Sequence, residues 1–330
     1  MIKSGQDGTT ILSSPVGLIS IANSPPSVET LGYFHEARVV GSALPHYFCR
    51  VFCAMPELAE VEWYRKQWNA GLGQVIVDLA LHARKRIFRG TDTRALRQHL
   101  IGQKFLRSTR RGKRMLFEFS GDNPEIIGAR ESIRSWLGIH LGMTGTLRVE
   151  APSYRPEKHD HLVLFQKERA LVFRDSRQFG RVRFHHGKDE PDWWKSDVPE
   201  IVSPEFNRQF VDQFLDRHRK APIKAVLLLQ NGFPGIGNWM ADEILWRAKI
   251  LPSRPAGKLS AEKRAALLRE TKFVVRKSLQ TLGRDYSDPP RTWLIHQRWK
   301  STGICPIHRT RLKRATIGGR TTAWCPRCQR

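Results

Sequence analysis

Cysteine and long apolar runs are both scarce in this sequence. Only 5 of the 330 residues are cysteine, which is too few for a disulfide framework and agrees with a reducing compartment. No apolar run approaches the ~18 residues that a membrane-spanning helix needs. The weakly apolar residues 11–22 lack a basic flank and a cleavage site, so we do not expect a signal peptide. The sequence therefore excludes the disulfide-rich secreted class and predicts no membrane contact.

Acidic residues are also few compared with basic ones. The chain has 31 Asp and Glu against 56 Lys and Arg, which gives a net charge of +25 and a pI near 10.5. Residues 1–54 carry three basic and three acidic side chains, so the whole excess lies in residues 55–330. A basic surface can be merely solvated, but an excess of this size favours a polyanionic partner, most simply nucleic acid.

Composition and periodicity divide the chain into five parts, which together predict an α+β fold with several domains. The first part is rich in Ser, Gly and Pro, and we expect it to be disordered or to precede the true start at Met55. The five parts are an extension (1–54), a strand-rich domain (55–187), a hinge (188–202), a helical domain (203–292) and a cysteine-containing end (293–330).

The predicted secondary structure changes type at the hinge. Before it, a helix near 56–71 and a second one capped by Asp92 or Thr93 accompany a series of short strands, which predicts a β-sandwich flanked by helices. The strands are expected near 75–81, 105–106, 114–119, 135–140, 144–149, 161–165 and 170–174. After the hinge, helices are expected near 204–217, 222–230, 238–248 and 260–282.

A motif at residues 55–62, MPELAEVE, contains the first candidate catalytic groups. If Met55 is removed, Pro56 carries a free secondary amine, and α-amino groups titrate near ~8 and are good nucleophiles at neutral pH. Such an amine can attack an electrophilic sugar carbon and form an iminium ion. Glu57 beside it can transfer a proton. The alternative is an ordinary helix start, because proline and acidic residues are both common there.

A glycine-rich segment, NGFPGIGN, occupies residues 231–238 between two predicted helices. Its backbone amides lie close to a helix N-terminus and could bind a phosphate group. A plain helix–helix turn is the alternative, and the positive charge of the chain favours the phosphate site.

The last 26 residues carry the pattern of a metal site. Three thiolates and one imidazole, arranged as two knuckles, fit a closed tetrahedral zinc site with no open position, so the predicted zinc is structural. The span between the knuckles should form a β-hairpin that turns at Gly318 and Gly319. Arg320 at its tip could contact DNA or could be a solvated surface residue. The candidate zinc ligands are Cys305, His308, Cys325 and Cys328.

Seven motifs, in order along residues 55–330, resemble those of bacterial formamidopyrimidine-DNA glycosylase, a family of base-excision repair enzymes. The resemblance implies an N-terminal β-sandwich flanked by helices, a helix-two-turn-helix domain and a C-terminal β-hairpin zinc finger. The motifs are MPELAEVE (55–62), RRGK (110–113), HLGMTG (140–145), KHDH (158–161), DSRQFG (175–180), PGIGN with ADE (234–238 and 241–243), and GRTT with CPRCQ (319–322 and 325–329).

The resemblance implies catalytic roles for four residues. Pro56 is similar to the amine that attacks C1′ of the damaged nucleoside, and Glu57 is similar to the acid that protonates the sugar ring oxygen. Glu60 resembles a carboxylate that helps to organise the site. Lys113 resembles the lysine that contacts a DNA phosphate and assists strand cleavage.

Further matched residues imply contacts with DNA. Three of them resemble the residues that fill the gap left by a flipped base, with Phe179 as the wedge and Arg177 facing the orphaned cytosine. Three others resemble phosphate clamps around the extruded nucleotide. The gap-filling residues are Met143, Arg177 and Phe179, the phosphate clamps are Lys224, Asn238 and Arg320, and His159 of the KHDH motif is a further expected DNA contact.

The implied enzyme is bifunctional. It excises oxidised purines such as 8-oxoguanine and formamidopyrimidines, and it cleaves the strand as an AP lyase by β,δ-elimination through a Schiff base at Pro56. Its expected partner is double-stranded DNA that contains oxidised bases or abasic sites. It needs one structural Zn²⁺ and no nucleotide cofactor, because the amine is the electron sink. We expect a monomeric cytoplasmic enzyme associated with the bacterial nucleoid.

The sequence departs from the family pattern at three places. Residues 1–54, if retained, would block the amine of Pro56. Ala59 replaces the usual proline, and His308 replaces the usual second cysteine, although histidine is a competent zinc ligand. The segment 283–303 looks shorter than usual in the region whose loop covers 8-oxoguanine, which bears on substrate preference.

Three other functions stay open. An endonuclease VIII-like glycosylase for oxidised pyrimidines is favoured by the short segment 283–303 and disfavoured by the gap-filling set at Met143, Arg177 and Phe179. A non-catalytic damaged-DNA-binding protein would result if residues 1–54 are retained. A general zinc-finger DNA-binding module would explain the charge and the cysteines but not the ordered motifs.

Overall fold

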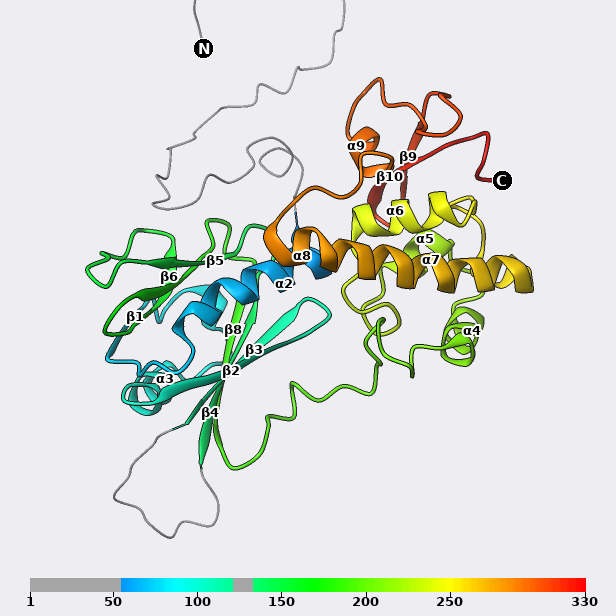
Figure 1. Cartoon of the computed structure of the whole chain (residues 1–330). Helices are drawn as coiled ribbons and strands as arrows, with labels where there is room; N and C mark the ends of the chain where they lie inside the picture. The colour runs from blue at the N-terminus through cyan, green and yellow to red at the C-terminus, as the bar shows by residue number, and fades with distance from the viewer. Residues whose placement is uncertain (1–54, 121–132) are drawn as a thin grey trace, which may run out of the picture. The chain divides into compact units, whose positions relative to one another are not determined.

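The computed structural model describes residues 55–120 and 133–330 (Figure 1). The expectations for residues 1–54 lie outside the described residues. Across the two described ranges, no helix combines the length and the apolar character needed to cross a membrane.

Two four-stranded antiparallel sheets make up the first half of the described chain (Figure 1). One sheet has the strand order β1-β6-β7-β5, and the other has the order β2-β3-β4-β8. The first contains β1 (Asp78–Leu81), β5 (Thr146–Glu150), β6 (Asp160–Phe165) and β7 (Ala170–Arg174). The second contains β2 (Lys104–Arg111), β3 (Arg114–Ser120), β4 (Arg134–His140) and β8 (Arg181–Gly187).

The two sheets form the predicted sandwich because alternate side chains of each strand enter one apolar core. Phe117 and Leu137 of the second sheet are fully buried in the same cluster as Leu164 and Phe173 of the first. Three short helices accompany the sandwich: η1 (Trp68–Gly71), η2 (Arg86–Phe88) and α3 (Thr93–Leu100). Asp92 caps α3 as predicted, since its carboxylate accepts hydrogen bonds from the backbone N–H groups of Arg94 and Ala95.

Among the described strands, β8 is the one that the sequence did not predict. It pairs with β4 from Arg181 opposite His140 to Gly187 opposite Arg134. Only Val182 of this strand is fully buried, because the opposite face carries arginine and histidine. The apolar alternation is therefore too weak to mark a strand in the sequence.

Helices form the second half of the described chain. The helix α4 begins at Arg208 rather than near 204, because Asn207 is its N-cap and accepts a hydrogen bond from the Phe210 N–H at 3.0 Å. The helices are α4 (Arg208–Arg217), α5 (Ile223–Leu227), α6 (Asn238–Arg247), η3 (Ala256–Lys258), α7 (Ala261–Gln280), α8 (Leu282–Asp285) and α9 (Ile295–Arg298).

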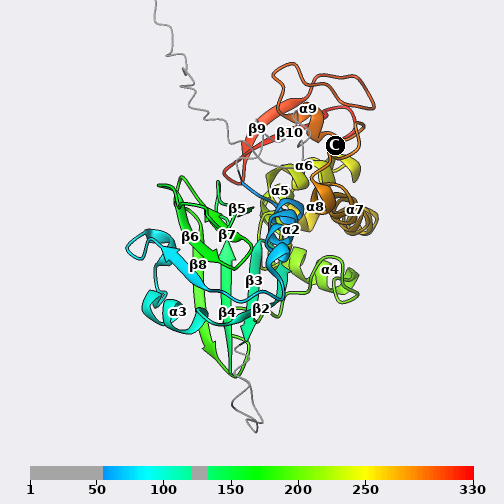
Figure 2. The ribbon, with the colours of Figure 1, turned by 60° about the vertical axis from the view of Figure 1, so that its left-hand side comes forward.

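Helix α2 (Leu58–Gln67) lies between the sandwich and the helical half (Figure 2). Leu58 and Ala59 are buried in the helical core, whereas Val61 is buried in the sandwich core. The Leu58 N–H donates to the carbonyl of Gly235 at 3.0 Å. The first turn of α2 is thereby held against the glycine-rich segment, and the two residues before it lie where both halves meet.

The C-terminal hairpin has the predicted form. Strands β9 (Lys313–Ile317) and β10 (Arg320–Trp324) pair directly across the turn. Gly318 and Gly319 have φ values of +61° and +72°, the left-handed conformation that a two-residue hairpin turn requires at both positions. The predicted α+β fold, with sandwich, helical domain and hairpin, is confirmed.

One buried carboxylate joins the helices to the hairpin. Asp242 of α6 accepts hydrogen bonds from Lys224 Nζ at 2.5 Å and from Arg298 Nη2 at 2.6 Å. It also accepts a hydrogen bond from the backbone N–H of Ala323 in β10 at 3.1 Å. Elements α5, α6, α9 and β10 therefore share a single ionic centre.

Candidate active site

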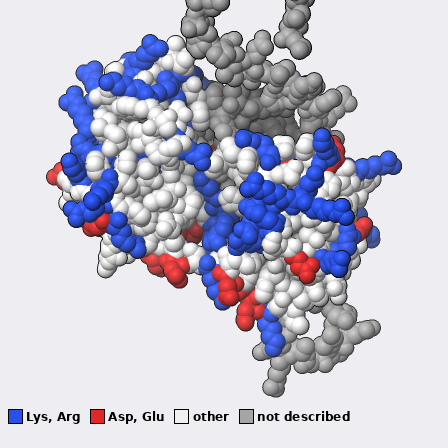
Figure 3. Space-filling model, turned by 180° about the vertical axis from the view of Figure 1, so that it is seen from behind, with Lys and Arg blue, Asp and Glu red and all other residues white. Residues whose placement is uncertain are grey.

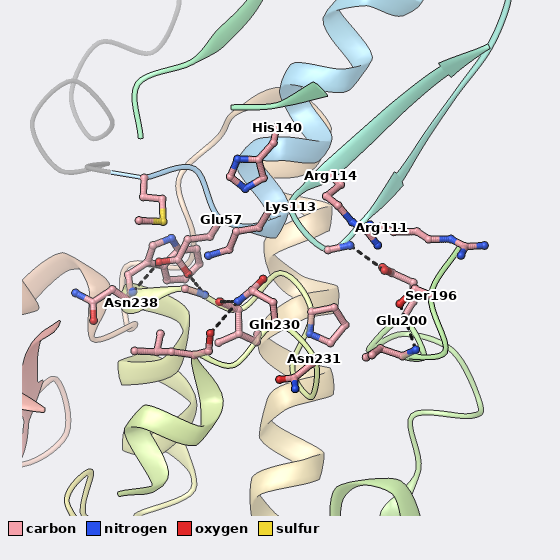
Figure 4. Close-up of a pocket in the computed structure, with 18 of the residues that line it drawn as sticks. Glu57, Arg111, Lys113, Arg114, His140, Ser196, Glu200, Gln230, Asn231 and Asn238 are labelled. Carbon is pink, nitrogen blue, oxygen red and sulfur yellow. Dashed lines mark hydrogen bonds between the residues drawn. The ribbon is translucent and has the colours of Figure 1, made fainter. Parts of the chain in front are cut away.

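A cavity of about 680 Å³ lies between the sandwich and the helical half (Figure 4). Elements far apart in the sequence contribute to its lining: the start of α2, the turn between β2 and β3, the loop after β4, the start of α6 and the tip of the hairpin. Five of the predicted site residues meet here, namely Glu57, Lys113, Met143, Asn238 and Arg320.

The carboxylate of Glu57 occupies the N-terminus of α6. It accepts hydrogen bonds from the backbone N–H groups of Gly237 at 2.9 Å, Trp239 at 2.8 Å and Met240 at 3.1 Å. A helix leaves these first amides unpaired, and its dipole favours a negative charge beside them. The glycine-rich segment was expected to present such amides to a phosphate. In the structure they hold a carboxylate of the chain itself.

Burial raises the pKa of Glu57 to about 7, although the charge of Lys113 and the amides of α6 act in the opposite direction. The nearby Glu60 adds to the increase. Glu60 is itself buried and accepts a hydrogen bond from Trp239 Nε1 at 3.0 Å. Figure 4 shows Lys113 reaching toward Glu57. Glu57 can thus hold or release a proton near neutral pH at the cavity wall, as a general acid must.

Pro56 lies directly beside this carboxylate. It is buried, and its neighbour Met55 lines the cavity. While Met55 is attached, the Pro56 nitrogen belongs to a peptide bond and has no basic lone pair. A nucleophilic amine at this position requires that bond to be absent.

Two loops that contact each other, residues 140–145 and 175–180, carry the residues expected to fill the gap that a flipped base leaves in the DNA. Asp175 joins them, because its carboxylate accepts hydrogen bonds from Thr144 Oγ1 and from the Gly180 N–H, both at 2.7 Å. Gly142 has a φ of +67°, and a side chain there would lie only 2.5 Å from the Gly180 nitrogen. Glycine is therefore required for the two loops to approach so closely.

The side chains on these loops project from the core. Phe179 is 44% exposed, and the guanidinium carbon of Arg177 lies 5.0 Å from the centre of its ring. Met143 is half-buried. An exposed aromatic ring held on a rigid loop is suited to enter a base stack. His159 lies at the base of the same loop, where its carbonyl accepts a hydrogen bond from the Asp175 N–H at 3.0 Å, and it does not line the cavity.

The start of α6 meets the hairpin at the rim of the cavity. Asn238 Nδ2 donates to the carbonyl of Thr321 at 3.0 Å, beside the exposed Arg320. Lys224 differs from the expectation of a phosphate clamp. Its side chain is fully buried, and Nζ donates to the Asn238 carbonyl at 2.6 Å and to Asp242. In this arrangement it orients the start of α6.

His140 is a site residue that the sequence reasoning did not single out. It lines the cavity, and Figure 4 shows it above Lys113. Burial and the charges of Lys113, Arg114 and Arg89 lower its pKa to about 4. Its Nδ1 accepts a hydrogen bond from the Gly142 N–H at 3.1 Å, so the neutral ring carries its proton on Nε2. The sequence did contain a signal for this residue, namely a histidine at the end of a predicted strand in a chain rich in basic residues.

The four predicted metal ligands lie together away from this cavity. The ligand atoms of Cys305, His308, Cys325 and Cys328 all lie within 4.8 Å of one another. Trp246 Nε1 donates to Cys305 Sγ at 3.3 Å. Burial raises the pKa of the Cys305 thiol, but hydrogen bonds from the backbone of His308 and from Trp246 outweigh it and bring the pKa to about 7. A lowered thiol pKa favours the thiolate that binds metals, so the cluster could hold a metal ion.

Two family models match the chain. One is described as the formamidopyrimidine-DNA glycosylase N-terminal domain and matches residues 55–182, and the other as the formamidopyrimidine-DNA glycosylase H2TH domain and matches residues 198–288. Fold and site therefore define a DNA glycosylase. The chain belongs to the formamidopyrimidine-DNA glycosylase family, as the ordered motifs predicted.

Individual relatives agree with this assignment. The formamidopyrimidine-DNA glycosylase of Xanthomonas campestris pv. campestris is 31% identical over 290 residues, which cover 84% of this chain and 100% of the relative. That of Ralstonia nicotianae is 33% identical over 296 residues with the same coverage. A solved structure of Lactococcus lactis Fpg with DNA containing N7-benzyl-Fapy-dG has a TM-score of 0.72 and 27% identity, and the match covers 83% of this chain and 100% of that one.

Proposed function

We propose that this chain, with Pro56 as its first residue, is a bifunctional DNA glycosylase and AP lyase that acts on oxidised purines in double-stranded DNA. The observation that carries the proposal is the position of Glu57. Its carboxylate has a pKa near 7, lines the cavity and is adjacent in sequence to Pro56.

The reaction uses the amine of Pro56 and the proton of Glu57. The lone pair of the amine attacks C1′, and the bond from C1′ to the oxidised purine breaks with its electrons leaving on the base, which takes up the proton that the amine nitrogen loses. Glu57 gives its proton to the sugar ring oxygen, so the ring opens and an iminium ion forms at C1′. Loss of a proton from C2′ then expels the 3′ phosphate, and a second elimination expels the 5′ phosphate. Lys113 stabilises the negative charge of a phosphate at the cavity wall.

Solved relatives support the substrate class. Structures of Lactococcus lactis Fpg contain DNA with Fapy-dG or with an abasic site. One further complex contains an oxidised pyrimidine. This last complex, together with the short segment 283–303, favours a second candidate function, the excision of oxidised pyrimidines. A comparison of excision rates on 8-oxoguanine and on an oxidised pyrimidine separates the two.

The Cys305 cluster is proposed to bind one structural Zn²⁺. Three thiols and one imidazole match the donors that zinc prefers, and four protein ligands leave no position for a substrate. Bound zinc would fix the two knuckles at the base of β9 and β10 and so hold Arg320 at the cavity rim. It takes no part in the reaction.

Borohydride trapping tests the proposed chemistry. A chain that starts at Met55 is expressed, and its mass is checked for loss of that methionine. It is then mixed with borohydride and duplex DNA that carries an abasic site or 8-oxoguanine. We expect a covalent protein–DNA adduct, and peptide mapping should place it on Pro56 and not on Lys113.

The chain of residues 1–330 is the matched control, because it has the same cavity without a free amine at Pro56. It should give no adduct while still binding the DNA. An adduct of equal yield in this chain, or one mapped to Lys113, would overturn the proline mechanism. Tight binding without an adduct in either chain would leave a non-catalytic damage-binding protein.

A further inference from the structure

A second cavity, of about 310 Å³, adjoins the first one. It shares Arg114 and His140 with the lining of the first cavity, and it reaches Phe179. Three further arginines and one tryptophan line it: Arg89, Arg181, Arg183 and Trp193. None of the proposed catalytic residues belongs to this second cavity, so the catalytic proposal leaves its function unexplained.

Strand pairing gathers basic side chains on one edge of the outer face of the second sheet. Arg111 of β2 lies opposite Arg114 of β3, which lies opposite His140 of β4, which lies opposite Arg181 of β8. Three arginines and the neutral His140 thus lie in one row across the four strands. Like charges directly opposite each other across strands destabilise a sheet. The directly paired Arg111 and Arg114 therefore cost folding stability unless an anion is bound.

Among the described residues, Glu200 acts on Arg114 only from a distance and forms no ion pair with it. Within the described ranges, no ion pair forms at Arg89, Arg111, Arg114, Arg181 or Arg183, which we call the arginine face. Arg181 Nε is buried and has no hydrogen-bond partner among the described residues. Desolvation lowers the pKa of Arg183, and the positive charges of Arg181, Arg114 and Arg89 lower it further.

The segment between the two domains orients these side chains. Trp193 packs against the sheet at Gly138, where any side chain would lie 2.5 Å from its indole ring. Its carbonyl accepts a hydrogen bond from Arg114 Nη1 at 2.7 Å, and its ring lies 5.5 Å from the guanidinium of Arg183. Trp194 lies under Arg111 and Arg114 at 5.6 and 5.5 Å. The guanidinium groups are thus held in place before any ligand arrives.

We propose that the arginine face binds successive phosphates of duplex DNA on one side of the damaged nucleotide. This inference rests on the proposed function, because it takes the first cavity as the place of the extruded nucleotide. The face begins at the lip of that cavity with Arg111 and Arg114 and runs toward the base of the wedge at Phe179. Figure 3 shows a dense group of Lys and Arg side chains on one face of the molecule with few acidic ones among them.

The dimensions suit a DNA backbone. Four strands spaced ~4.8 Å apart make the row about 14 Å long, which equals the axial rise of about four base pairs. Planar guanidinium groups bind phosphate oxygens in pairs, and Arg is preferred where such bidentate contacts are made. A surface that contacts only phosphates lengthens the stretch of DNA bound by the protein and does not distinguish between base sequences.

The test is the salt dependence of binding by the chain beginning at Pro56. The probe is a duplex with a central tetrahydrofuran abasic-site analogue, which binds but does not react. Each phosphate contact contributes about 0.9 to the slope of log Kobs against log salt. The double variant Arg181→Ala with Arg183→Ala should lower the slope by about 1.8 and weaken binding at 0.1 M salt by up to about 60-fold. Its Tm should be unchanged or higher, because repulsion is removed.

Two control variants and a shortened duplex define the contact. Arg217→Ala removes an exposed arginine that also lies over an aromatic ring, Phe214, at 5.4 Å, and it should leave the slope unchanged. The variant Arg181→Lys with Arg183→Lys keeps the charge and should retain the slope. Shortening the duplex arm on one side only should make the wild-type chain and the alanine variant bind equally.

Three results would overturn the inference: a slope unchanged by the alanine variant, an equal loss with Arg217→Ala, or no dependence on either duplex arm. Failure of the catalytic proposal would look different. In that case borohydride yields no adduct at Pro56, while the salt slope on the unreactive duplex still separates the variants.

Discussion

Replacing Gly237 by alanine should displace Glu57 and disable the active site. Gly237 has a φ of −125° and a ψ of −158°, an extended conformation that alanine adopts without strain. The added methyl group would lie 2.5 Å from both Cγ and Oε1 of Glu57. Since ordinary contacts begin near 3.4 Å, the carboxylate must retreat by about 1 Å.

A retreat of this size breaks the hydrogen bonds that hold Glu57. The three amide contacts of 2.8 to 3.1 Å would lengthen beyond hydrogen-bond range. We expect a loss of about 3 kcal/mol of unfolding free energy from overpacking and from the broken bonds, which lowers Tm by about 6–12 °C. Misplacement of a catalytic group by about 1 Å costs about 100-fold in rate.

Single-turnover excision of 8-oxoguanine and a thermal melt measure the two effects. The matched control is Gly283→Ala in α8, where the nearest atom to the methyl group is the flexible end of Leu279 at 3.2 Å and the Ala59 carbonyl oxygen lies at an ordinary 3.4 Å. This variant should change Tm by less than about 3 °C. If Gly237→Ala keeps both the wild-type rate and the wild-type Tm, then Glu57 is not held by the start of α6 in the way described here.

Four further perturbations have defined outcomes. Because the proton of Glu57 is used and its pKa is about 7, base excision should slow above about pH 7, and a rate that still rises at pH 9 would contradict this role. Phe179→Ala should weaken binding to a tetrahydrofuran duplex at least about 10-fold with an unchanged melting curve, since the ring is 44% exposed. Lys224→Ala should cost about 3 kcal/mol in urea unfolding, because it removes one partner of a buried ion pair; a change below about 1 kcal/mol would argue against the pair. Elemental analysis should find one zinc per chain, and Cys325→Ser should lose it and lower Tm.

The sequence predicted those helices and strands whose ends are set by residues close by in the chain. Asp92, one of the two candidate caps, begins α3, the helix expected near 260–282 begins after Ser260, and Gly318 and Gly319 turn the hairpin. In each case the deciding contact spans only a few residues. The knuckle spacing around Cys305 likewise predicted a four-residue cluster that the structure contains.

Contacts between distant segments could not be predicted in this way. The partners of Glu57 on α6 lie 180 or more residues further along the chain, so the sequence showed free helix amides where the structure has satisfied ones. The resemblance implied a phosphate contact for Lys224, and the sequence alone does not show that Asp242 is its buried partner. Strand β8 was missed for a related reason, since arginines on its outer face concealed the alternation.

Asp242 has a consequence for how the C-terminal hairpin could have been acquired. Zinc-binding hairpins are often regarded as independent modules that can be moved between proteins. Here the backbone of β10 is bonded to a carboxylate inside α6, and that carboxylate is also shared by Lys224 and Arg298. If the hairpin were moved to another protein alone, it would keep its metal ligands. It would lose the contact with Asp242 that holds Arg320 beside the cavity. The transferable unit is therefore the helical domain together with its hairpin.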